Sequence, residues 1–116
     1  MATEVPLTLH EDNDETIELT ITPEQTGDTL AGVTVVELYL KVDRCEADTA
    51  SGVLKLTSAN PAQILVTSFS ASQIEALAFI PASALASPYD RFWRVDALAG
   101  ATRRTAMYGD VTVIDL

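Results

Sequence analysis

The sequence has few of the residues on which metal binding and covalent catalysis most often depend. It contains one cysteine, Cys45, and one histidine, His10, in 116 residues. A single cysteine cannot form an intrachain disulfide or a cysteine-based zinc site, and a single histidine excludes the paired-histidine metal motifs. Phosphate-binding glycine loops and the G-x-S-x-G nucleophile motif are also missing. We therefore expect no enzymatic activity and no cofactor.

Basic residues are also scarce, with seven Lys and Arg against seventeen Asp and Glu, a formal charge of −10. This balance argues against binding to nucleic acid or to anionic membranes, which requires positive charge. No stretch reaches the ~18 apolar residues of a membrane span, and residues 1–15 lack the basic and apolar regions of a secretory signal. We expect the chain to fold in a reducing cytoplasm and to leave the cell, if at all, as part of a particle released by lysis.

The composition favours one folded domain over residues 1–116. Apolar residues make up 47% of the chain, which is too many for a disordered protein. Thirty residues are the β-branched Val, Ile and Thr, which suit strands better than helices. The acidic excess is confined to residues 1–48, which carry a net charge of −10, whereas residues 49–116 sum to zero.

Alternation of apolar and polar residues predicts strands over most of the chain. The expected strands are 3–9, 16–22, 33–43, 53–56, 64–66, 73–80, 89–98 and 102–114. Residues 73–80 also contain helix-forming Ala, Glu and Leu, but the alternation and the stop at Pro81 favour a strand. Residues 82–87 predict one short helical turn after Pro81. The pattern indicates an all-β protein, an antiparallel immunoglobulin-like β-sandwich of seven to eight strands.

Three polar features have both a functional and an ordinary interpretation. The acidic run of residues 11–15 offers oxygen ligands for calcium, but it lacks the glycine and the last glutamate of an EF-hand loop, which favours a charged turn. His10 at a strand end is best interpreted as a solvated side chain. Cys45 stands beside Glu46 in a polar loop, and nearby anions disfavour a reactive thiolate.

Aromatic residues make up only 6% of the chain, so each one matters to the interpretation. Trp93 alternates in phase with Val95 and is expected in the core. Tyr39 alternates out of phase with Leu38 and Leu40, which places it on the opposite face of its strand. We predict Tyr39, together with Tyr108, as candidate residues of a partner-binding surface.

The last third of the chain resembles the end of small immunoglobulin-like domains in tailed-bacteriophage virions. The resemblance lies in an aromatic strand at Pro88–Asp96, a turn at Gly100 and a closing strand at Arg104–Val113. The opening is similar as well, because Ile17–Thr22 and Leu30–Val35 resemble the start of upper-baseplate N-terminal domains and related head and tail accessory proteins. That family has no catalytic residues to carry over.

The resemblance implies a virion structural protein, an accessory or decoration subunit located in the virion. Its expected partner is the major capsid protein or a tail protein, and it could also form a homo-oligomer. The alternative is a carbohydrate- or peptide-binding module on the same sandwich, although few aromatic residues are left over for a sugar platform.

Overall fold

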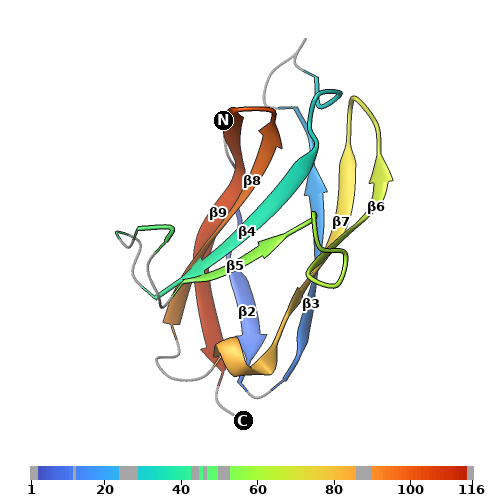
Figure 1. Cartoon of the computed structure of the whole chain (residues 1–116). Coiled ribbons are helices and arrows are strands. Elements are labelled where there is room, and N and C mark those ends of the chain that lie inside the picture. Colours follow the sequence, from blue (N-terminus) through green and yellow to red (C-terminus); the bar gives the residue numbers. More distant parts are fainter. Residues whose placement is uncertain are drawn as a thin grey trace.

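The chain folds into two facing β-sheets (Figure 1), as the alternating pattern predicts. The structure is a computed structural model that describes residues 3–11, 13–23, 29–42, 45, 47–49, 53–85 and 90–114. The strands are β1 (Thr3–Glu4), β2 (Leu7–His10), β3 (Glu15–Ile21), β4 (Val35–Lys41), β5 (Leu54–Thr57), β6 (Ile64–Phe69), β7 (Ile74–Ile80), β8 (Asp90–Ala99) and β9 (Thr102–Ile114). A 3-10 turn, η1, covers Ala82–Leu85. The predicted β-sandwich is confirmed, and the ambiguous segment 73–80 is a strand; its immunoglobulin-like character stays a prediction.

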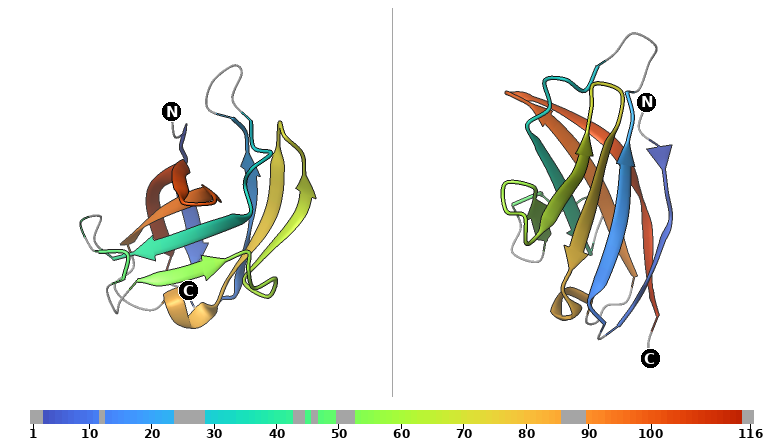
Figure 2. Two further views of the ribbon diagram at one scale, coloured as in Figure 1. Left: turned by 45° about the horizontal axis from the view of Figure 1, so that its top comes forward. Right: turned by 90° about the vertical axis from the view of Figure 1, so that its right-hand side faces the viewer.

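The two sheets differ in size. The large sheet has six strands in the order β1-β9-β8-β4-β5, with β2 also paired to β9, and the small sheet has the order β3-β7-β6. Figure 2 shows the two sheets facing each other, with β6 at the outside of the small sheet. Among the described residues, the domain therefore has four sheet edges, formed by β1 and β2, by β5, by β3 and by β6.

The N-terminal segment departs from the purely antiparallel prediction. Both β1 and β2 pair with β9 in parallel, whereas every other pair in the two sheets is antiparallel. Residues 3–9 were expected as one strand, but the segment is interrupted at Val5 and Pro6, since proline has no N–H to donate to a ladder. Val5 still donates its backbone N–H to the carbonyl oxygen of Tyr108, at 2.8 Å.

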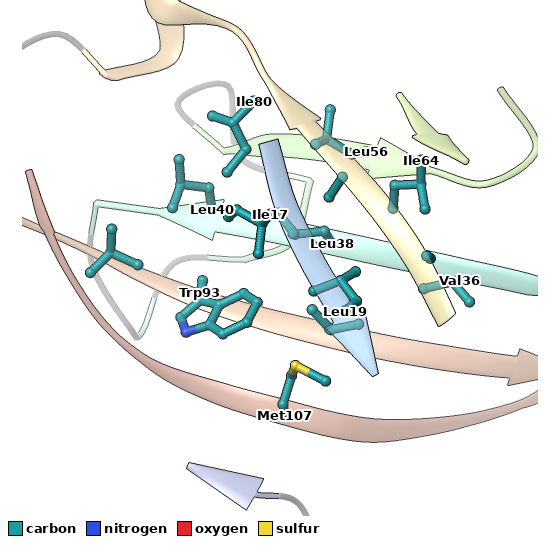
Figure 3. Packing of buried hydrophobic residues seen from close by; sticks show 14 of the residues in the cluster. Ile17, Leu19, Val36, Leu38, Leu40, Leu56, Ile64, Ile80, Trp93 and Met107 are labelled. Atoms are coloured by element: carbon teal, nitrogen blue, oxygen red, sulfur yellow. The ribbon is translucent and has the colours of Figure 1, made fainter. Parts of the chain in front are cut away.

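The core fills the space between the sheets, as Figure 3 shows for a part of it. Trp93 is buried there, as predicted, and its indole Nε1 donates a hydrogen bond of 2.8 Å to the carbonyl oxygen of Val5. Gly109 lies beneath this contact, where a Cβ atom would collide with the same carbonyl. The N-terminal segment is thus held against β9 by an indole donor and by the absence of a side chain at residue 109.

Candidate functional site

The outer face of the large sheet carries a cluster of charged residues that the strand pattern places away from the core. We call it the ionic cluster, formed by Glu37, Tyr39, Lys41, Asp48, Lys55, Arg94, Asp96, Arg103 and Thr105. On an exposed sheet face such residues would normally be solvated. Here Glu37, Lys41 and Asp96 are buried, and Asp96 has an exposed fraction of 0%.

The strand register brings the two buried carboxylates together. Glu37 on β4 is the direct neighbour of Asp96 on β8, and Asp96 is the neighbour of Thr105 on β9. Like charges at this spacing repel each other, so a cation between them is required. Arg103 supplies it, because its Nη1 lies 2.7 Å from Glu37 Oε1 and 2.8 Å from Asp96 Oδ2.

Alternating charges continue from this pair in both directions. Lys55 Nζ lies 3.2 Å from Glu37 Oε2 at one end. Towards the other end, Arg94 bridges two carboxylates. Its Nε lies 3.0 Å from Asp96 Oδ1, and its Nη2 lies 2.7 Å from Asp48 Oδ2. Lys41 closes the chain, with its Nζ 2.6 Å from Asp48 Oδ1. Each buried charge in the cluster thus has an opposite charge within hydrogen-bond distance, and this attraction offsets the desolvation cost of burying it.

Tyr39 lies at the centre of the ionic cluster and is 3% exposed. The prediction that it faces away from Leu38 and Leu40 is correct, but its side chain is buried on that face. Three cations lie over its ring, the closest being the Arg94 guanidinium at 4.7 Å from the ring centroid. Its hydroxyl donates to Glu37 Oε1 at 2.9 Å. Long side chains from neighbouring strands therefore cover Tyr39, and these side chains form the solvent-accessible surface at this point of the sheet.

The ionic cluster shifts the pKa values of Glu37 and Asp48 towards the charged form and the pKa of Tyr39 towards the neutral form. Burial alone would raise the pKa of Glu37, but hydrogen bonds from Arg103, Tyr39 and Lys55 outweigh it and lower that pKa. Hydrogen bonds from Arg94 and Lys41 lower the pKa of Asp48 to about 2. Burial, followed by the hydrogen bond to Glu37, raises the pKa of Tyr39. Glu37 and Asp48 are therefore ionised, and Tyr39 neutral, at neutral pH.

Tyr108, the second predicted partner residue, lies on the same face beside the cluster. It is the direct neighbour of Arg94 across β8 and β9, and it is half-buried. Its ring packs against that of Phe92, with 6.5 Å between the centroids. Tyr39 and Tyr108 therefore share one face, but only Tyr108 keeps part of its side chain accessible. Their role in binding a partner stays a prediction.

The remaining polar candidates stay apart from one another. His10 ends β2, with its Nδ1 3.4 Å from Glu15 Oε1, and Cys45 is exposed in the loop after β4. Of the acidic run at residues 11–15, Asp12 lies outside the described residues. Within the described part of the chain, no group of three or more His, Cys, Asp or Glu side chains is arranged to hold a metal ion, and no helix is long and apolar enough to cross a membrane.

A second surface, which the strand pattern did not single out, is the edge of the small sheet formed by β6. Residues 56–74 contain no charged side chain, although the chain as a whole has a net charge of −10. This stretch includes β6, where Leu65, Val66 and Phe69 are exposed. They are three of the five large hydrophobic side chains that are exposed in the described residues. The signal for this surface was the gap in charge between Lys55 and Glu75.

A hollow of about 370 Å³ opens at one end of the sandwich, between the end of β3 and the start of β9. Its walls are mostly apolar, with Ile21, Leu30 and Val33 among them, and Arg104 lies at its border. The volume falls in the range of small-ligand sites, which also require a few convergent polar groups. Threonine side chains and Arg104 are the polar groups that line it, and they define no particular ligand.

Comparison with known proteins assigns no family to this arrangement. No protein-family model matches the chain, and no curated protein matches it. The function must therefore be argued from the two surfaces themselves.

Proposed function

We propose that the protein is a structural accessory subunit of a tailed-bacteriophage particle and that it acts by surface contact with a capsid or tail protein. The virion assignment rests on the resemblance of the sequence Pro88–Asp96 and of the segments around it to virion immunoglobulin-like domains. The mode of action rests on the surface of β6.

The single observation that carries the contact role is the exposure of Leu65, Val66 and Phe69 on an uncharged strand. Several solvent-exposed apolar side chains on one uncharged strand, in a protein otherwise rich in charge, are typical of interaction sites. Burying them against a partner would be favourable by about 25 cal/mol for each Å² of apolar surface removed from water. The ionic cluster, by contrast, already satisfies its own charges and needs no partner.

The proposal is tested on particles of the phage that encodes the chain. Mass spectrometry of purified particles should detect the protein, and its copy number relative to the major capsid protein would separate a shell subunit from a tail or vertex subunit. Purified protein should also bind to particles that lack it. A Leu65→Lys variant should bind more weakly, because the charge would have to be desolvated at the contact.

The matched control is Ile114→Lys, since Ile114 and Leu65 are equally exposed, at 41%, and the charge change is the same. Particles without the protein would contradict the proposal. Binding to a glycan array in the same preparation would then favour the carbohydrate-binding alternative.

A further inference from the structure

The edge of β6 differs from the other three sheet edges in having no charged residue and no proline to prevent pairing with another strand. An edge strand presents unpaired backbone N–H and C=O groups, and proteins usually protect such edges with charges or proline. The β1 and β2 edge contains Glu4 and Pro6, the β5 edge contains Lys55, and the β3 edge contains Glu15 and Glu18. β6, with the sequence ILVTSF, contains neither.

β6 pairs with β7 along one side, and no strand in the described residues pairs with its other side. Its one protective feature is a register shift between Val66 and Ser68, which leaves the Thr67 hydroxyl bonded to the carbonyl of Glu75. Irregularities of this kind twist an edge but add no charge to it. The strand therefore keeps its capacity to accept a further strand.

We infer that two copies of this chain associate by antiparallel pairing of their β6 strands. The inference rests on the proposed function in one respect, that β6 is a protein-contact surface, and it names a second copy as the occupant. The pairing would extend the small sheet across a two-fold axis, in the order β3-β7-β6-β6-β7-β3. A two-fold contact of this kind is closed and self-complementary, so it ends at the dimer.

Among the edges of the domain, the charge distribution favours β6 for contact with a second copy. Two molecules with a net charge of −10 repel each other over most of their surfaces. Residues 56–74 are uncharged, so β6 itself brings no charge to the contact, and the adjacent strand β7 carries one charged residue, Glu75. The exposed Leu65, Val66 and Phe69 would then meet the same apolar set on the other copy. A strongly acidic or basic partner segment gains no complementary charge at this edge.

The interface is small, and this determines the strength that we expect. Six residues of strand span about 20 Å, and contacts well below about 1,200 Å² of buried area form weak, transient complexes. We expect a dissociation constant in the micromolar range or weaker. On a particle, where subunits are held close together, such a contact would still contribute through its high effective concentration.

Sedimentation equilibrium of the full chain over a range of concentrations tests the inference. The wild-type protein should dimerise, and raising the salt from about 0.01 M to about 0.1 M should strengthen the dimer because the repulsion is screened. Leu65→Lys should weaken the dimer at least tenfold, whereas Ile114→Lys should leave it unchanged. A protein that stays monomeric at all concentrations, or a dimer that Leu65→Lys leaves intact, would overturn the inference.

Hydrogen exchange of the wild-type protein tests the same contact without a substitution. Backbone amides of residues 64–69 should exchange more slowly at concentrations where the dimer forms, and amides of β3, the other edge of the small sheet, should not change. Protection at another edge instead of β6 would also overturn the inference. The outcome of the particle-binding assay is independent of these two measurements. A monomer that binds particles would support the proposed function and contradict the inference. A dimer that does not bind particles would support the inference and contradict the proposed function.

Discussion

The outer face of the large sheet and the edge of the small sheet solve the same problem in opposite ways. Both lie outside the core, where a strand must present its side chains or its backbone to water. The large sheet covers its face with its own charged side chains, so that Tyr39 and Asp96 are buried without any partner. The small sheet leaves β6 apolar and uncharged, with Phe69 half exposed, at 50%.

The difference shows that the charged side chains of this protein do more than keep its surface hydrated. Four of its seven Lys and Arg residues, Lys41, Lys55, Arg94 and Arg103, belong to the ionic cluster. They neutralise carboxylates on one face of the large sheet. By contrast, β6, the loop before it and the turn after it contain no charged residue. The comparison predicts that substitutions in the cluster affect folding and that substitutions on β6 affect association.

The largest effect is expected from Asp96→Ala. Asp96 is fully buried and accepts hydrogen bonds from Arg94, Arg103 and Thr105, so its removal leaves Arg103 between fewer opposite charges. Breaking a buried ion pair by removing one partner typically costs about 3–5 kcal/mol. The free energy of unfolding, measured in urea, should fall by that amount. Glu18→Ala, at an exposed carboxylate of β3, is the control and should change it by less than about 0.5 kcal/mol.

If the two variants had similar stabilities, the ionic cluster would contribute little to folding. The large sheet would then resemble β6 in depending on a partner to cover its face.

An intermediate effect is expected from Gly109→Ala, which tests how the β9 edge of the large sheet is closed by β1 and β2. The added Cβ would collide with the carbonyl of Val5, the group that accepts the Trp93 hydrogen bond. Overpacking of this kind costs about 1–3 kcal/mol. Hydrogen exchange should become faster at residues 3–10 in particular, since this is the segment that must move.

Gly32→Ala provides the matched control, because its Cβ would meet only the Ala99 side chain at 3.7 Å, an ordinary contact. If both variants were equally stable, the N-terminal segment would be able to shift without loss. The β9 edge would then be as accessible to strand addition as we propose for β6.

The sequence was sufficient to locate most of the strands but not to predict how they pair. Alternation located β3, β7 and β9 to within one or two residues, and it also identified Trp93 as a core residue. The parallel pairing of β1 and β2 with β9 was missed, because it joins the two ends of the chain and leaves no local pattern.

The ionic cluster was missed for a related reason. Alternation places Tyr39 on the outer face correctly, but it does not reveal which neighbours are long enough to cover it. The burial of Tyr39 depends on Arg94 and Arg103, which lie 55 and 64 positions further along the sequence and become neighbours only through the pairing of β4, β8 and β9. Exposure could be predicted only once the register was known.

The smallest effect concerns the dependence of the ionic cluster on pH, through Asp48. The pKa of Asp48 is lowered from its ordinary 3.8 to about 2 in the folded protein, mainly by Arg94 and Lys41. Its contribution to stability is therefore complete above the ordinary value and is lost as the pH falls through about 2. Asp48 is a third exposed, so solvent screening limits that contribution to less than about 1 kcal/mol.

The Asp48→Asn variant should be slightly less stable than the wild type at neutral pH and should lose less stability as the pH falls from about 4 to about 2. Part of the loss should remain in this variant, because the pKa of Glu37 is lowered as well. Urea unfolding at a series of pH values measures the difference, with Glu18→Gln as a control of equal charge change. If Asp48→Asn and Glu18→Gln gave the same pH dependence, the fall in stability would reflect the net charge of the molecule alone. The ion pairs on the outer face of the large sheet would then contribute nothing specific to stability, and this face would not differ from the β6 edge in its electrostatics.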